Sequence, residues 1–199
     1  MTLRRALPIL TVLLLCAGCA SEAVEPPGLD ATVTADPSPT PTPSPTPTGP
    51  VLEPSDPELG IVFEDVPVLE GAQVDVYNTV AAYRKEYWRM LTTNDVSPGF
   101  DVLASPELVA MMQRIATQNA DQQLLLGGAF HTRISAVAAD GESATAIVCD
   151  DYRDVIGTDP NGTYTSEEIG LENLASQLTL GRSVGGMWRV LSGSPAGGC

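Results

Sequence analysis

Apolar residues between positions 71 and 93 recur at helical spacing and predict one long amphipathic helix. Val76, Val80, Tyr83, Tyr87 and Met90 follow one another at intervals of three or four residues, so they share one face. Aromatic side chains make this face thick, which indicates a core helix that is buried against another layer. The alternative interpretation is that these aromatic side chains form one wall of a ligand site.

A second helix is predicted to begin after Ser105. This serine can cap the helix, Pro106 suits the first helical position, and Glu107 complements the helix dipole. The pattern fades between residues 119 and 122. The residues of its expected buried face are Leu108, Met111 or Met112, and Ile115.

The remainder of the chain has the pattern of strands separated by turns. Strands are expected over residues 124–137 and 143–155, because Asp140-Gly141 between them is a strong hairpin signal. A second turn is expected at 158–162, followed by strands at 168–180 and 183–191. Residues 58–69 form an extended arm that is expected to pack as an edge strand or lead-in. Helices followed by an antiparallel meander predict an α+β fold, with the helices on one face of the sheet.

The N-terminus has the organisation of an export signal. Arg4 and Arg5 precede an apolar run over residues 6–15, and Ala17-Gly18-Cys19 resembles the lipobox of bacterial lipoproteins. That resemblance implies a signal peptide over residues 1–18 and lipidation of Cys19, which anchors the protein to the extracytoplasmic face of the cell membrane. The alternative is a secreted protein cleaved near Ala17 or Ala20.

Residues 19–57 are expected to form a disordered linker before a domain over residues 58–199. Proline alternates with serine and threonine between positions 36 and 48. Such a run has nothing to bury and favours polyproline II at ~3.1 Å per residue, so the linker would reach on the order of 100 Å. We interpret it as a spacer.

Charge and hydropathy restrict the partners. The 199 residues include 10 Lys and Arg against 25 Asp and Glu, a formal net charge of −15. An acidic surface repels phosphate backbones, so nucleic acid is not an expected partner. No stretch approaches the ~20 apolar residues of a membrane-spanning helix, so membrane attachment is expected to come from lipid.

The cysteines fit an exported protein. Cys16 leaves with the signal peptide and Cys19 carries the lipid, so Cys149 and Cys199 remain as one pair. In an oxidising compartment a disulfide between them is expected. The two cysteines and the lone His131 show no metal-ligand spacing, and the sequence predicts neither a metal nor a cofactor.

Residues 70–192 resemble the nuclear transport factor 2-like superfamily, whose cystatin-like cone is shared with ketosteroid isomerase. More narrowly, the chain resembles actinobacterial cell-envelope lipoproteins that carry this domain behind a proline-rich linker. The resemblance implies helices packed on a curved antiparallel sheet, a fold that hosts enzymes, binding modules and assembly domains. The matching segments are Ala82-Tyr83-Arg84, Tyr87-Trp88, Ala139-Asp140-Gly141, Ala144-Thr145-Ala146, Cys149-Asp150-Asp151 and Met187-Trp188-Arg189-Val190.

The hairpin gives one concrete hypothesis for catalysis. If Asp140-Gly141 is a two-residue loop, His131 lies opposite Asp150 and both share a face with Arg133 and Tyr152. The opposite face would then carry Phe130, Thr132, Ile134, Ile147, Cys149 and Asp151. A slip of one residue would exchange the two faces.

Three interpretations of these polar residues stay open. His131 with Asp150 could be an acid–base dyad, or Asp151 could be a lone base with Tyr87 as hydrogen-bond donor. The competing interpretation is that His131, Arg133 and Asp150 form a solvated, ion-paired stripe on the polar face of the sheet, while the opposite face packs under the helices.

The function expected from these patterns is non-enzymatic. The domain would bind a small apolar ligand in the cone or dock an envelope protein on the open sheet face. One alternative is a small isomerase or dehydratase that uses His131 with Asp150 or Asp151, and another is a structural homodimer. The candidate pocket residues are Tyr83, Tyr87, Trp88, Phe130, Ile134 and Ile147.

Overall fold

The computed structural model describes residues 54–199. The predicted signal peptide, Cys19 and the linker up to residue 53 therefore lie outside the described residues. Near the start of this part of the chain, the Ser55 hydroxyl accepts a hydrogen bond from the Phe63 amide at 2.9 Å. None of the helices in residues 54–199 is long and apolar enough to cross a membrane.

The two predicted helices are present. Helix α1 spans Ala72–Thr93 and ends at Asn94, whose left-handed backbone lets its amide bond to the Met90 carbonyl. Helix α3 spans Pro106–Asp121, and the Ser105 hydroxyl accepts a hydrogen bond from the Leu108 amide, as predicted. A short helix α2 at Gly99–Leu103, which was not predicted, lies between them and buries Phe100.

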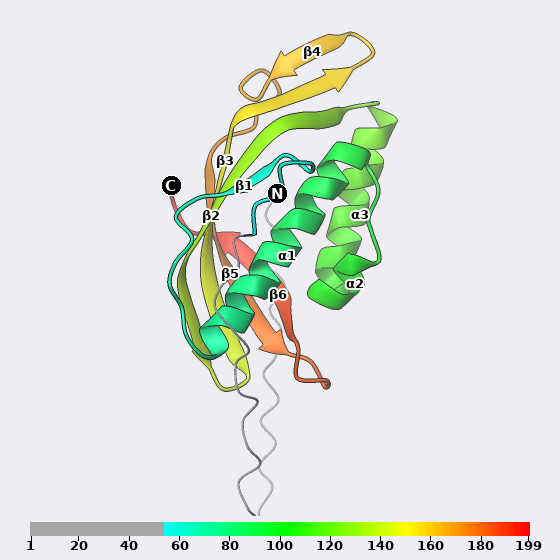
Figure 1. The fold of residues 1–199 in the computed structure, drawn as a ribbon. Coiled ribbons are helices and arrows are strands. Elements are labelled where there is room, and N and C mark those ends of the chain that lie inside the picture. The colour runs from blue at the N-terminus through cyan, green and yellow to red at the C-terminus, as the bar shows by residue number, and fades with distance from the viewer. Residues whose placement is uncertain (1–53) are drawn as a thin grey trace, which may run out of the picture. The chain divides into compact units, whose positions relative to one another are not determined.

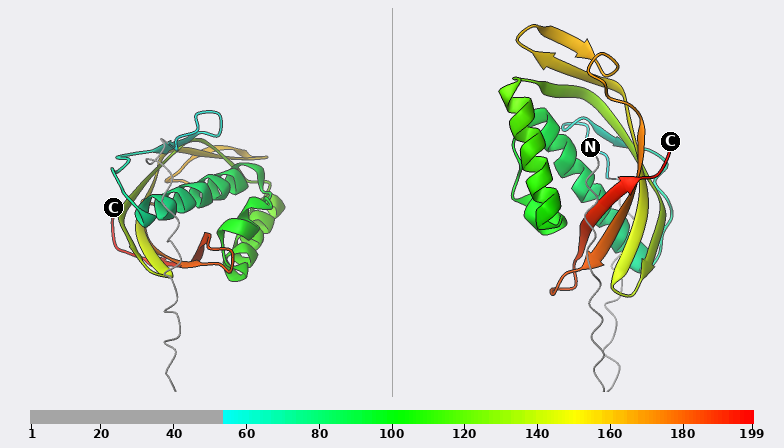
Figure 2. Two further views of the ribbon diagram at one scale, coloured as in Figure 1. Left: turned by 60° about the horizontal axis from the view of Figure 1, so that its bottom comes forward. Right: turned by 180° about the vertical axis from the view of Figure 1, so that it is seen from behind.

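Six strands form one sheet in the order β1-β2-β3-β5-β6, with β4 paired to β3. Every pairing is antiparallel except that of β1 with β2. Figures 1 and 2 show the three helices gathered on one face of the curved sheet. The predicted α+β class, with helices packed on a mostly antiparallel sheet, is confirmed. The strands are β1 Ile61–Phe63, β2 Leu125–Asp140, β3 Ser143–Asp159, β4 Gly162–Thr165, β5 Leu174–Arg182 and β6 Trp188–Pro195.

The last two strands begin later than predicted. Residues 166–170 form a turn instead of the start of a strand, so β5 begins only at Leu174. The break before β6 falls at Gly185 and Gly186 rather than at Gly181, because Gly186 takes a positive φ of 78° and closes the turn. The extended arm supplies β1, an edge strand as predicted.

The register of the β2–β3 hairpin differs from the prediction. Asp140 pairs with Ser143 around a Gly141-Glu142 loop, which moves the partners by two residues, and the bulge at Ala136 moves them back by one, so a net difference of one residue remains at His131. The pairing of His131 with Asp150 was therefore wrong. His131 pairs with Asp151, and Thr132 pairs with Asp150.

The corrected register changes which side chains of β3 face the helices. The β2 side chains that face the helices are Phe130, Thr132 and Ile134, as predicted. The β3 side chains on the same face are Tyr152, Asp150 and Val148. Ile147, Cys149 and Asp151, which were predicted to share this face, lie on the outer face with His131 and Arg133. The one-residue difference exchanged the faces of β3 because side chains alternate along a strand.

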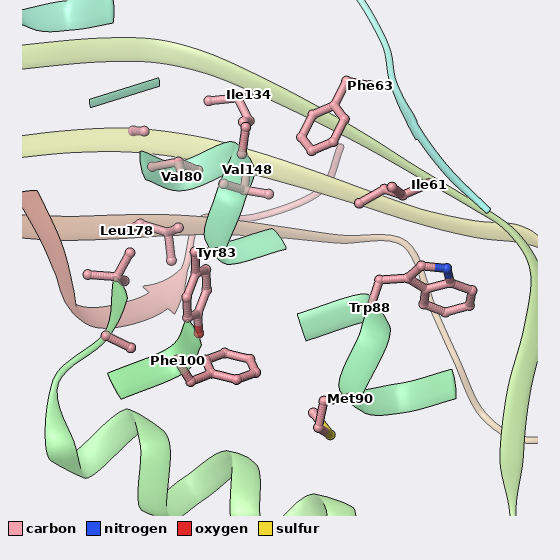
Figure 3. Close-up of a cluster of buried hydrophobic side chains, with 14 of the residues drawn as sticks. Ile61, Phe63, Val80, Tyr83, Trp88, Met90, Phe100, Ile134, Val148 and Leu178 are labelled. Carbon is pink, nitrogen blue, oxygen red and sulfur yellow. The ribbon is translucent and has the colours of Figure 1, made fainter. Parts of the chain in front are cut away.

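The core lies between α1 and the inner face of the sheet (Figure 3). Trp88 of α1 stacks on Phe130 of β2 with ring centroids 5.0 Å apart, and both are fully buried. The Trp88 indole also donates a hydrogen bond to the Leu59 carbonyl at 2.9 Å. The arm that leads into β1 is thereby fastened to the main helix.

Strands β2 and β3 approach each other closely at Gly128. Its φ is +85°, and an added Cβ would lie 2.2 Å from the Asp154 carbonyl oxygen. Gly141 also has a positive φ, of +57°, but a Cβ there would meet nothing within 4 Å. Gly141→Ala should therefore lower the free energy of unfolding by only ~1–2 kcal/mol from its left-handed backbone.

Gly128→Ala should destabilise the protein clearly more than Gly141→Ala, because the clash adds to the same backbone strain. Urea denaturation followed by circular dichroism measures both. Equal destabilisation by the two substitutions would contradict the close approach at Gly128.

Candidate functional site

A cavity of about 510 Å³ opens between the helices and the inner face of the sheet. Helix α1 supplies Tyr83, Arg84 and Tyr87 to its lining. Helix α3 adds an apolar wall, and strands β3, β5 and β6 close the other side. Leu174 and Leu191 are about half exposed and lie at its rim. Its apolar lining residues include Leu108, Met111, Met112, Val148 and Leu178.

The floor of the cavity holds an ion pair between Arg84 of α1 and Asp150 of β3. Each side chain is only 8% exposed. One Asp150 oxygen accepts a hydrogen bond from the Arg84 guanidinium, and the other accepts one from the Thr132 hydroxyl at 2.9 Å. Both carboxylate oxygens are therefore engaged by the protein itself. The pair joins the main helix to the centre of the sheet.

Aromatic rings surround the guanidinium. Its central carbon lies 4.1 Å from the centroid of the Tyr87 ring and 5.4 Å from that of Phe130. The Tyr87 and Tyr152 hydroxyl oxygens are 3.2 Å apart, so one hydroxyl donates to the other. Arg84 is therefore held by an acid on one side and by ring faces on the other.

Burial governs the ionisation of the floor. It raises the pKa of the Asp150 carboxyl, while the charge of Arg84 and the Thr132 hydrogen bond act in the opposite direction. Burial is the largest single influence on Arg84 and would lower its pKa, but the charge of Asp150 and the nearby Tyr152, Tyr87 and Tyr83 together outweigh it, so the pKa of the guanidinium is raised. Burial also raises the pKa of Tyr152 and of Tyr83. Both phenols therefore stay protonated near neutral pH and act as hydrogen-bond donors.

The six pocket residues predicted from the sequence separate into three groups. Tyr83 and Tyr87 line the cavity. Trp88, Phe130 and Ile134 are buried in the core instead and do not line it. Ile147 was placed wrongly: it pairs with Ser135 and Gln177 on the outer face, as the corrected register requires.

His131 lies on the outer face of the sheet and not at the cavity. Its Nδ1 is 3.0 Å from a Glu64 oxygen, and its Nε2 is 3.2 Å from an Asp154 oxygen. The proposed dyad with Asp150 is wrong, because the two side chains lie on opposite faces of the sheet. Asp151, the other candidate base, forms an ion pair with Arg153.

The outer face therefore matches the competing interpretation of an ion-paired stripe for His131 and Arg133, but not for Asp150, which is buried on the inner face. Arg133 and Asp65 add a further pair at 3.3 Å, in which both side chains are largely exposed. Across residues 54–199, no group of three or more His, Cys, Asp or Glu side chains is arranged to hold a metal ion.

Cys149 and Cys199 form a disulfide, as predicted, with their Cα atoms 5.6 Å apart. Cys149 lies in the middle of β3 on the outer face, so the bond fastens residue 199 to the back of the sheet. Asp150, the next residue along β3, points to the cavity floor. The disulfide and the ion pair therefore hold the same point of the strand from opposite sides.

The pairing of Arg84 with Asp150 was missed in the sequence. The signal was present in the helix pattern, because Arg84 lies four residues after Val80 and four before Trp88, which are both buried. A charged residue in the middle of a buried helix face needs a partner. The partner could not be chosen from the sequence because its identity depends on the hairpin register.

No protein-family model and no curated protein sequence matches the chain. Among solved structures it is similar to the intermembrane space region of the chloroplast protein ARC6, with a TM-score of 0.47 and 14% identity over 65% of this chain and 98% of that one.

Two bacterial structures are also similar. One is a protein of Thiobacillus denitrificans assigned as a calcium/calmodulin-dependent protein kinase type II association domain, with a TM-score of 0.35 and 12% identity over 59% of this chain and 94% of that one. The other is a conserved protein from Planctomyces limnophilus, with a TM-score of 0.35 and 14% identity over 60% and 99% of the respective chains. These similarities concern the arrangement of helices and strands and say nothing about a ligand or an activity.

Removing one member of the buried ion pair should strongly destabilise the protein. Arg84→Leu leaves Asp150 buried without its counter-charge, and the free energy of unfolding should fall by ~3–5 kcal/mol. The double variant Arg84→Leu/Asp150→Leu should recover part of this loss, because no buried charge then remains unpaired. Urea denaturation measures all three proteins.

Arg133→Leu is the matched control, since it removes an arginine from the exposed pair with Asp65. It should change the free energy of unfolding by no more than ~1 kcal/mol. An Arg84→Leu variant as stable as Arg133→Leu would contradict the role of the buried pair.

Proposed function

We propose that the protein is a lipid-anchored, extracytoplasmic binding module whose cavity holds a small, mainly apolar molecule. The observation that carries this proposal is the open cavity of about 510 Å³ with an apolar wall and a small polar floor. Binding sites for small molecules have volumes of roughly 300–1,000 Å³ and combine apolar walls with a few fixed polar groups. The cavity has both properties.

The chemistry of the floor supports binding rather than proton transfer. Each Asp150 oxygen already accepts a hydrogen bond, one from Arg84 and one from Thr132, which favours a structural carboxylate over a general base. His131 contacts Glu64 and Asp154 on the opposite face of the sheet. Asp151, the other base that the sequence offered, is ion-paired with Arg153, so these contacts favour a binding module over the isomerase or dehydratase alternative.

The cellular location is proposed from the sequence. The lipobox-like Ala17-Gly18-Cys19 and the proline-rich linker support attachment of the domain to the outside of the cell membrane through a long spacer. The disulfide between Cys149 and Cys199 suits an oxidising compartment. The pattern of helices and strands over residues 70–192 supports assignment of the domain to the nuclear transport factor 2-like superfamily. Docking of an envelope protein or of a second copy on the outer sheet face stays a prediction.

Filling the cavity should abolish ligand uptake. Ser176 is half-buried, lines the cavity and pairs with Val148 on the inner face of the sheet. Ser176→Trp should place an indole in the cavity and lower the affinity for the uncharged fluorescent dye 1-N-phenylnaphthylamine by at least ~10-fold. Fluorescence titration of the purified protein measures the affinity.

The neighbouring residue on the same strand provides the control. Gln177 is exposed and pairs with Ile147 on the outer face, so Gln177→Trp adds the same indole on the opposite side of the sheet. It should leave dye binding unchanged. Equal affinities for Ser176→Trp and the unmodified protein, or no dye binding by the latter, would contradict the proposed function.

Lipidation is tested separately. Mass spectrometry of the mature protein should find an acylated Cys19 at its N-terminus, and Cys19→Ser should move the protein from the membrane fraction to the soluble fraction. Cys16→Leu, a change to the residue type that lipoboxes favour at this position, should leave the protein in the membrane fraction. A mature chain that begins at an unmodified Ala20 or Ser21 would contradict the anchor.

A further inference from the structure

We propose that the cavity selects uncharged molecules whose inner end carries a hydrogen-bond acceptor, and that it rejects carboxylates. This inference rests on the proposed function and specifies the ligand class of the same cavity. It follows from two features of the lining: its charges cancel, and its floor keeps one hydroxyl proton that no protein group in residues 54–199 accepts.

The charges of the cavity cancel at both ends. At the floor, the positive charge of Arg84 is neutralised by Asp150. At the exposed end, Glu107 and Arg114 of α3 are the other two charged lining residues, and they also have opposite signs. The lining is therefore neutral as a whole, although the chain carries a formal net charge of −15.

A carboxylate at the floor would be a second negative charge beside Asp150 in a buried place. Arg84 could compensate one of the two carboxylates but not both, and an uncompensated charge away from water is strongly unfavourable. The acidic surface of the chain adds a repulsion at longer range. A cation would find Asp150 already bonded to Arg84 and Thr132. Both arguments favour an uncharged ligand.

The hydrogen-bonding groups at the floor determine which polar group the ligand should carry at its inner end. Tyr87 and Tyr152 each have one hydroxyl proton, and only one of the two protons is used between them. Within residues 54–199, neither hydroxyl has a further hydrogen-bond partner. An oxygen of a ketone, ester or amide at the inner end of the ligand would accept the unused hydroxyl proton.

The test compares two molecules of similar length that differ in charge. 2-Undecanone presents an uncharged carbonyl oxygen, and decanoate presents a carboxylate. Each is used to displace 1-N-phenylnaphthylamine from the purified protein. We expect 2-undecanone to bind at least ~10-fold more tightly than decanoate. Equal affinities, or tighter binding of decanoate, would overturn the proposal.

Asp150→Asn should reverse this preference. The substitution keeps the shape of the side chain but removes its charge, so Arg84 becomes the uncompensated group. Decanoate should then bind at least ~10-fold more tightly than it does to the unmodified protein. An unchanged affinity for decanoate in a folded Asp150→Asn variant would contradict the charge argument.

A second variant keeps the proposal falsifiable if Asp150→Asn does not fold. Tyr87→Phe/Tyr152→Phe removes the spare hydroxyl donor and leaves the ring positions occupied. The dye affinity of this variant is titrated first, and the affinity for 2-undecanone, obtained by displacement with that value, should fall at least ~5-fold. An undiminished affinity for 2-undecanone would contradict a role of the spare hydroxyl donor. If the unmodified protein binds the dye without a preference between ketone and carboxylate, only this inference fails. If it binds none of the three molecules, the proposed function fails as well.

Discussion

The buried ion pair between Arg84 and Asp150 connects the two layers of the domain. It joins the middle of α1 to the middle of β3, and both charges are almost completely removed from water. Such a pair is stable only when each member is compensated, and here Thr132 and the Tyr87 ring complete the set. The pair fixes how the helix lies on the sheet and also forms the polar floor of the cavity. Stability and the proposed binding therefore depend on the same side chains.

Successive side chains of β3 point alternately to the two faces of the sheet, so this strand contributes both to the cavity floor and to the outer face. Val148, Asp150 and Tyr152 face the cavity and core, whereas Cys149 and Asp151 face outward. The disulfide to Cys199 holds the outer side of the strand at the residue next to the ion pair. The charged outer face, with His131 between Glu64 and Asp154, is separated from the cavity by the sheet itself. Each face has its own electrostatic environment because a pleated strand presents alternate residues to each side.

The helices could be predicted from local sequence signals. The site could not, because it depends on how two strands pair. The apolar spacing of α1 and the Ser105-Pro106 start of α3 act within one turn of a helix, so both were found correctly. The faces of β3 depend on the hairpin register, which a loop at Gly141-Glu142 and a bulge at Ala136 moved by one residue. That single step exchanged Asp150 with Asp151 and moved Ile147 out of the pocket. No pattern within β3 itself carries this information, since both of its faces contain apolar and acidic residues.

Methionine methyl NMR tests most directly whether the cavity is the binding site. Met111 and Met112 line the cavity, whereas Met90 is buried in the core and Met187 is exposed on the β5–β6 turn. On titration with 1-N-phenylnaphthylamine, the account predicts that the methyl signals of Met111 and Met112 shift and those of Met90 and Met187 do not. Shifts confined to Met187, or a spectrum that the dye leaves unchanged at saturating concentration, would contradict it.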